Sequence, residues 1–94
     1  MKETDHRIIE LFKALGSPPR MKIIRILLNG SERVGILAER LGKKSTTISK
    51  HLKILRDLEL VSFITKENCV YYSIKKDKIE KLLSLAGEIV SRNR

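Results

Sequence analysis

The stretch KKSTTISKHLKILR, residues 43–56, combines an apolar stripe with charge of a single sign. Ile48, Leu52 and Leu55 recur at the spacing of one face of a helix. The stretch also holds five Lys or Arg, one His, four Ser or Thr and no acid. Because an ordinary exposed helix mixes both signs of charge, the stretch predicts a helix that buries one face and offers the other to a polyanion.

The flanking residues predict a shorter helix before this stretch and a β-hairpin after it. ILAERLG, residues 36–42, is typical of a two-turn helix that ends at its glycine. Together the two helices make a helix-turn-helix over about 36–57. The runs LVSFITK (60–66) and VYYSI (70–74) are rich in β-branched and aromatic residues, and ENC (67–69) is expected to be the turn between them.

Three further helices are expected. One lies at each end of the chain, and the third directly follows the N-terminal helix. Residues 4–15 have apolar residues at helical spacing, and Gly16 ends that helix. Ser17 can then cap a buried helix in which Pro18 takes the first position. Residues 33–35 are expected to be a short extended link.

The last helix is predicted over about 77–91. Asp77 and Glu80 have the spacing of a capping box, with Asp in place of Ser or Thr. The order of four helices, hairpin and helix predicts a mainly α fold with a small β-hairpin (α+β). The chain is thus predicted to be a single winged helix-turn-helix domain over 1–94, with the wing at about 60–74.

The composition favours a nucleic-acid ligand. The 94 residues carry a net charge of +9 and the sequence pI is about 10.0, which suggests nucleic acid or an anionic membrane surface. No run approaches the roughly 20 apolar residues of a membrane-spanning helix. The N-terminus lacks the apolar core of a signal peptide, so we expect a cytoplasmic protein. The absence of Gln and the abundance of Lys, Arg and Glu favour a thermophilic source.

The chemistry-bearing residues do not form the pattern of an enzyme. There is no nucleophile–base pair, Gly-rich phosphate loop or metal cluster. We therefore expect no catalytic residue, no metal and no cofactor. Cys69 is the single cysteine, so it is expected to be a reduced thiol near the surface, an intersubunit disulfide or a redox sensor.

The polar face of the predicted helix at 45–56 suits the DNA major groove. Thr46, Ser49, Lys50 and Lys53 cluster opposite the apolar stripe. In a helix-turn-helix, the second helix lies in the major groove and its first residues reach base edges. The alternative is a solvated cationic face in which the hydroxyls act only as caps. His51, at the flank, either binds a phosphate or packs as a half-buried neutral histidine.

These pieces resemble the ArsR-type (arsenic-repressor-like) winged-helix transcriptional regulators. The matching segments are LFKALGSPPRMKIIRILL (11–28), ILAERLG (36–42), STTISKHLKILRDLELV (45–61) and VYYSI (70–74), and the resemblance covers about residues 8–75. It implies a homodimer whose first and last helices, about 4–15 and 77–91, form the interface. The alternative is that the apolar face of the last helix folds onto its own domain.

The resemblance also assigns site residues. The implied recognition positions are Ser45, Thr46, Thr47, Ser49, Lys50, His51 and Lys53. Lys43 and Lys44 replace an apolar residue and a capping Ser of the family, so the helix is expected to begin at Ser45 with two extra cations for phosphate. The implied wing contacts are Lys66 and Asn68. The implied interface consists of Ile8, Leu11, Phe12 and Leu15 with Leu82, Leu83, Ala86 and Ile89.

The chain departs from the family at its metal sites. Many members carry a C-V-C element before D-L-A, where this chain has RVGIL, so Arg33 and Gly35 take the cysteine positions. A second family site uses Asp and His pairs on the last helix, but here that helix has Asp77, Glu80 and Glu88 without a His. The family's metal sites are therefore not expected in this chain.

The resulting expectation is a sequence-specific regulator that binds double-stranded DNA as a homodimer. We expect a repressor on a palindromic operator, with half-sites about one helical turn (~10 bp) apart or a multiple of that. A non-specific architectural nucleic-acid-binding protein is the main alternative, because phosphate contacts alone carry no sequence information. A protein-interaction module is the third reading, which the acid-free face disfavours. No membrane partner is expected.

Overall fold

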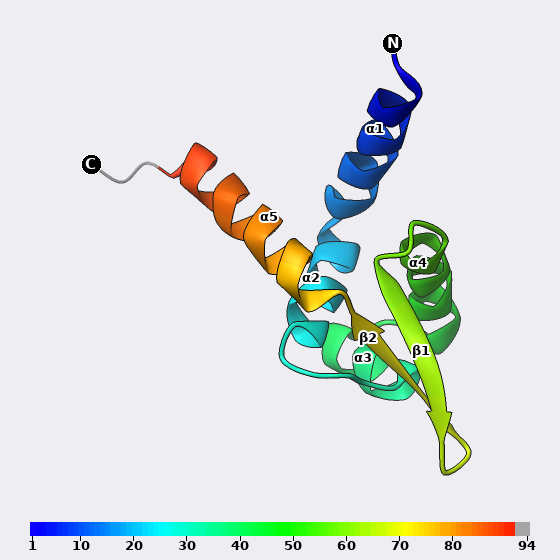
Figure 1. The fold of residues 1–94 in the computed structure, drawn as a ribbon. Helices are drawn as coiled ribbons and strands as arrows, with labels where there is room; N and C mark the ends of the chain where they lie inside the picture. Colours follow the sequence, from blue (N-terminus) through cyan, green and yellow to red (C-terminus); the bar gives the residue numbers. More distant parts are fainter. Residues whose placement is uncertain (92–94) are drawn as a thin grey trace.

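The computed structural model describes residues 1–91, which form five helices and one antiparallel hairpin. Residues 92–94 of the predicted domain lie outside the described residues. Figure 1 shows the hairpin projecting from one end of the molecule, and α1 and α5 projecting from the other. The predicted class, mainly α with a small hairpin, is confirmed. The elements in chain order are α1 (Glu3–Leu15), α2 (Pro18–Leu27), α3 (Val34–Leu41), α4 (Ser45–Asp57), β1 (Val61–Lys66), β2 (Cys69–Ile74) and α5 (Lys76–Val90).

The core lies where α2, α3 and α4 meet. Its completely buried large side chains are Ile23, Ile24, Leu37, Ile48, Leu52 and Leu55. Gly42 ends α3 in the left-handed conformation, with φ of 65°, which glycine adopts without the steric cost that a Cβ would add. The N–H of Lys43 then donates to the carbonyl of Ala38 at 3.0 Å. Because α3 ends in this tight turn, the chain leads directly into α4.

The wing is a six-pair hairpin in which Val61 lies opposite Ile74 and Lys66 lies opposite Cys69. Its turn is two residues long, Glu67 and Asn68, both with positive φ. Such a turn follows the right-handed twist of the flanking strands. The expected three-residue turn at 67–69 is therefore wrong, because Cys69 is the first residue of β2.

The extended link begins and ends earlier than predicted. Glu32 forms a bridge with Tyr72, in which Glu32 N–H donates to the Tyr72 carbonyl at 3.0 Å and Tyr72 N–H donates back at 2.8 Å. α3 begins at Val34 because Arg33, its N-cap, is extended and its carbonyl already accepts from the N–H of Leu37. The link is thus residues 32–33 rather than the expected 33–35, and Glu32 pairs it with an edge of the wing.

The start of α5 also differs from the prediction. The helix begins at Lys76 with Lys75 as N-cap, and no side-chain cap was found there among the described residues. The Asp77–Glu80 capping box is therefore wrong. Asp77 instead lies in the first turn, where its negative charge is favourable beside the exposed N–H groups of the helix. The earlier caps behave as predicted, since Ser17 caps α2 at Pro18 by accepting from Arg20 N–H.

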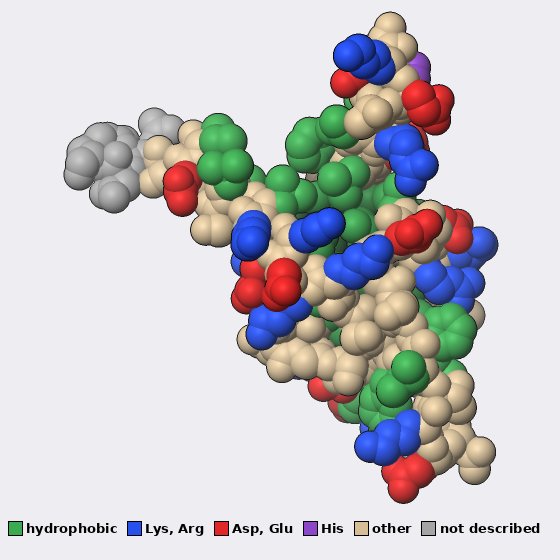
Figure 2. All heavy atoms as spheres, viewed as in Figure 1, with side chains coloured by type: hydrophobic (Ala, Val, Ile, Leu, Met, Phe, Trp, Pro, Cys, Tyr) green, Lys and Arg blue, Asp and Glu red, His purple; other side chains and the backbone are tan. Residues whose placement is uncertain are grey.

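Only part of α1 and α5 packs on the core of the chain. Leu15 and Leu83, which the resemblance assigns to an interface between chains, are buried in this chain's own core. Leu11 and Leu82 are half-buried against that core. Figure 2 shows hydrophobic side chains gathered where α1 and α5 diverge. The exposed large apolar residues of these helices include Ile8, Ile9, Phe12, Leu85, Ile89 and Val90.

Candidate nucleic-acid interface

The orientation of α4 is as the sequence predicts. Ile48, Leu52 and Leu55 point into the core and are at most 1% exposed. The opposite face is open to solvent and offers cations and hydroxyls. Its exposed residues are Ser45, Thr46, Ser49, Lys50 and Lys53, while Thr47 is half-buried. The apolar side of α4 therefore packs into the core, and its other side exposes a surface suited to an anionic, hydrogen-bonding ligand.

The first turn of α4 is open to an anion. The helix begins at Ser45 as predicted, with Lys44 as N-cap, and within residues 1–91 no side chain caps it. The first intrahelical bond runs from Ile48 N–H to the Lys44 carbonyl at 3.1 Å. The N–H groups just before Ile48 therefore lack intrahelical partners, which favours a phosphate at this end. Lys43 and Lys44 are exposed beside it.

Lys53 is less free than the sequence reading assumed. Its Nζ lies 3.2 Å from an Asp57 carboxylate oxygen, one helical turn further on. Both side chains are largely exposed, so the pair contributes at most about 1 kcal/mol. A phosphate that binds Lys53 must compete with this carboxylate. Lys50, earlier on the same face, is in none of the ion pairs found within residues 1–91.

His51 is half-buried at the edge of the recognition face. Nη1 of Arg20 lies 3.3 Å from its Nδ1. Burial first, and then the charges of Arg20 and Lys43, lower the pKa of His51 below its ordinary value of 6.5. The imidazole is therefore neutral at pH 7, and its Nδ1 side is already engaged within the protein.

The wing carries the predicted contacts at its tip, and a cation that the sequence reading missed. Lys66 and Asn68 are exposed there. Arg33, from the segment that pairs with β2, extends Nη1 to within 3.9 Å of Cys69 Sγ. The available signal was the resemblance, which puts Arg33 at a position where many members of that family have a metal-binding cysteine. A guanidinium in this place adds positive charge to the wing.

An aromatic contact joins the wing to α4. The guanidinium carbon of Arg56 lies 5.2 Å from the ring centroid of Phe63, a cation–π distance. Phe63 in turn packs against Tyr72 with 5.5 Å between ring centroids. Because Arg56 is in the last turn of α4 and Phe63 is in β1, the two predicted DNA-contacting elements are held to each other.

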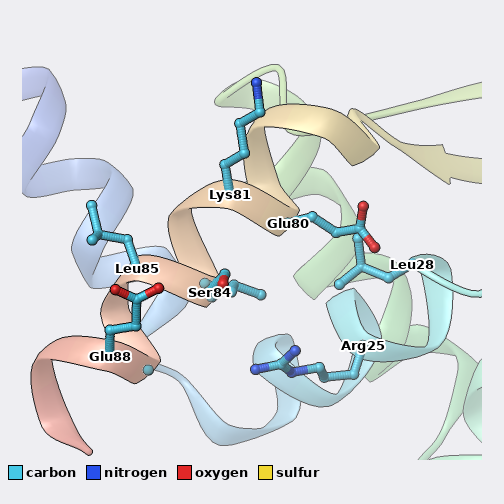
Figure 3. A pocket seen from close by; sticks show the side chains of 9 residues that line it. Arg25, Leu28, Glu80, Lys81, Ser84, Leu85 and Glu88 are labelled. Carbon is cyan, nitrogen blue, oxygen red and sulfur yellow. The ribbon is translucent and has the colours of Figure 1, made fainter.

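An open groove of about 650 Å³ separates α2 from α5. Figure 3 shows Arg25 of α2 reaching toward α5, with Glu80 and Glu88 on α5 lying well apart. These two carboxylates are eight residues apart, or ~12 Å along the helix, which is too far for one metal ion. Among residues 1–91, no three His, Cys, Asp or Glu side chains are grouped so as to hold a metal. The same described part contains no helix that could span a membrane.

Comparison with known proteins identifies the family. The family of bacterial regulatory proteins named arsR matches residues 17–62, which include α2, α3 and α4. An uncharacterized HTH-type transcriptional regulator of Methanocaldococcus jannaschii is 33% identical over 93% of this chain and 99% of its own length. The transcriptional repressor SdpR of Bacillus subtilis is 38% identical over 83% of this chain and 91% of its own.

A solved structure confirms the fold. The homodimeric winged helix-turn-helix DNA-binding domain Mb0332 of Mycobacterium bovis superimposes with a TM-score of 0.81. The match covers 95% of this chain and 86% of that one, at 24% identity. The full-length relatives show that this chain is a helix-turn-helix transcriptional regulator. The chain belongs to the arsR family of bacterial regulatory proteins.

Proposed function

We propose that this regulator is a homodimeric repressor that occupies a palindromic double-stranded operator. The observation that supports it most strongly is α4, whose apolar stripe is buried while its opposite face exposes hydroxyls and cations. Ser and Thr hydroxyls can bond base edges at close range, and Lys can reach guanine acceptors or phosphate oxygens. Direct readout of this kind supplies sequence preference.

The contacts divide by chemistry. Lys43, Lys44 and the open first turn of α4 would bind phosphate and set the register. Thr46, Ser49 and Lys50 would reach base edges in the major groove. Lys66 and Asn68 would touch DNA flanking the half-site. The remaining proposed contacts, at the start and the flank of the same face, are Ser45, Thr47, His51 and Lys53.

The exposed apolar residues of α1 and α5 support a homodimer. Phe12 is 56% exposed and Ile89 is 75% exposed. Covering such surface with another copy gains about 25 cal/mol per Å² of apolar area removed from water. Mb0332, which has the same fold, is homodimeric. The proposed interface residues that remain accessible are Ile8, Leu11, Phe12, Leu82, Ala86 and Ile89.

Repression follows from occupancy. A dimer seated on a promoter excludes the transcription machinery without further chemistry. SdpR, which is similar over most of this chain, is a transcriptional repressor. An operator as the partner supports the expectation of a cytoplasmic protein.

Selection of bound sequences from a random duplex library, at moderate and fixed salt, tests the proposal. We expect an enriched palindrome with half-sites about 10 bp apart or a multiple of that. A Thr46→Val protein should enrich a changed sequence, and a Lys13→Ala protein, altered in α1, should enrich the original one. Tight binding without enrichment would contradict the proposal and indicate an architectural role driven by charge.

A further inference from the structure

Arg20 joins three helices at the edge of the recognition face. Its backbone N–H donates to Ser17 Oγ at 3.4 Å, and its Nε donates to the carbonyl of Ala14 at 2.9 Å. Its Nη1 donates to Nδ1 of His51 at 3.3 Å. The side chain is half-buried, and none of the ion pairs formed within residues 1–91 includes it. The guanidinium is thus held by the end of α1 and directed at α4.

The sequence explains why Arg20 is held in this way. A continuing helix would pair the Ala14 carbonyl with the N–H of residue 18, but that residue is Pro18, which has no N–H. Because Ala14 is buried, its carbonyl needs a donor from the protein. Arg20 Nε supplies that donor and places a positive charge at the C-terminal end of α1, where it is favourable.

The bond to α4 determines the state of the imidazole. A guanidinium has only donors and cannot accept a hydrogen bond. Nδ1 of His51 must therefore be the acceptor, which leaves the ring neutral with its hydrogen on Nε2. Burial, together with Arg20 of α2 and Lys43 before α4, lowers the pKa of His51 and favours the same neutral form.

We propose that Arg20 is a positioning residue for DNA binding, because by occupying Nδ1 of His51 it fixes the tautomer that offers an Nε2–H donor to a DNA phosphate. The proposal rests on the proposed function of α4. A neutral donor binds a phosphate oxygen without taking up a proton, so the contact keeps one charge state across neutral pH. Without Arg20, the ring would adopt either tautomer and take up a proton beside the polyanion.

Nitrogen-15 NMR of the histidine rings in the free protein tests the tautomer. In the parent protein we expect His51 as the Nε2–H tautomer, with a pKa below 6.5. In Arg20→Gln the His51 midpoint should rise and the two tautomers should mix. Arg20→Met, which keeps a long side chain but has no N–H donor, provides a second variant should the first fail to fold. Identical His51 spectra in the parent and in a folded variant would overturn the proposal.

Duplex binding between pH 6 and 8 separates positioning from a merely structural role. Between pH 8 and 6, Arg20→Gln should gain roughly threefold to tenfold more affinity than the parent does, because its His51 takes up a proton at a higher pH. His51→Gln in the same background should remove that slope. A uniform loss at every pH would contradict the proposal. If the parent binds no duplex, both the proposed function and the role of Arg20 in DNA binding are contradicted. The NMR result still shows whether Arg20 sets the tautomer of His51.

Discussion

The helices α4 and α5 carry the same kind of apolar stripe, but only the α4 stripe is covered completely within the chain. In α4 the stripe is covered completely within one chain, and Leu52 is 1% exposed. In α5 only the first half packs on the chain, through Ile79 and Leu83, whereas the second half is open and its Ile89 is 75% exposed. The helix with the fully covered stripe can display its polar face to DNA, whereas the half-covered one still requires a partner.

This difference teaches that periodicity shows which face of a helix is apolar, but not what covers it. Both helices show apolar residues at intervals of three and four. What separates them is distance from the core along the helix axis, since the first part of α5 reaches the core and the rest projects beyond it (Figure 1). Variants that damage one stripe should therefore affect folding, and variants that damage the other should affect assembly.

The largest effect is expected from Leu52→Ala. Truncating this fully buried side chain should lower the free energy of unfolding by about 2–5 kcal/mol, because burial is lost and a cavity remains. Urea unfolding followed by circular dichroism measures it. The matched control is Leu85→Ala on α5, which is 56% exposed and should change the stability of the isolated chain far less. Equal losses would break the contrast between the two stripes.

The next effect concerns assembly. Ile89→Asp should leave the helical content unchanged but abolish the dimer, because a charge would be buried in an apolar interface. Two half-sites would then be bound independently, and affinity for the palindrome should fall roughly a hundredfold as the effective concentration is lost. Sedimentation and duplex titration measure the two quantities. An unchanged dimer would show that another surface pairs the chains.

Lys50→Ala should weaken duplex binding roughly tenfold and reduce the slope of log K against log salt by about one. The reason is the loss of one cation from the exposed face of α4. Titrations at several salt concentrations measure both quantities. The control is Lys13→Ala, which removes from α1 a cation whose Nζ lies 3.7 Å from Glu10. It should change neither the affinity nor the salt slope. If both variants weaken binding equally, net charge rather than the α4 face governs affinity.

A smaller gain is expected from Asp57→Asn. Removing the carboxylate beside Lys53 frees that ammonium for phosphate, so duplex affinity should rise about twofold, in keeping with the small energy of an exposed pair. Glu10→Gln removes the same charge from α1 and serves as the control. A gain of equal size in both would attribute the effect to net charge.

The smallest effect is the response of stability to acid. Because the folded-state pKa of His51 is lowered below 6.5, the unfolded chain binds more protons in that range. The contribution of His51 to the free energy of unfolding is therefore complete above about pH 6.5, and it declines as the pH falls through the folded-state pKa. Thermal melts of the parent and of His51→Gln should diverge only below that pH. Parallel curves would show that His51 does not contribute.

Local pattern was enough to predict most of the fold. The helices and the Ser17 cap follow from spacing and cap chemistry, and the α4 start at Ser45 follows from the family resemblance. The errors arose where local signals are weak. Gly35, a poor helix former, concealed the first turn of α3, and the turn Glu67–Asn68 lacks the glycine that usually marks two-residue hairpins.

The site was predictable on one helix and not between elements. The polar face of α4 could be read directly, and the Lys53–Asp57 pair was visible in principle from its spacing of four. The bond between Arg20 and His51 joins residues 31 apart, and the contact between Arg33 and Cys69 joins residues 36 apart. Such contacts depend on how the elements pack, which no local pattern encodes.

Dimethyl sulfate footprinting on a selected duplex would test the central claim, that α4 reads the major groove, most directly. Guanine N7 faces the major groove and adenine N3 faces the minor groove. The account predicts guanine N7 protection in two half-sites about 10 bp apart, with protection lost in Thr46→Val/Lys50→Ala and retained in Lys13→Ala. Full N7 reactivity in a bound complex, or protection that the α4 double variant leaves unchanged, would contradict it.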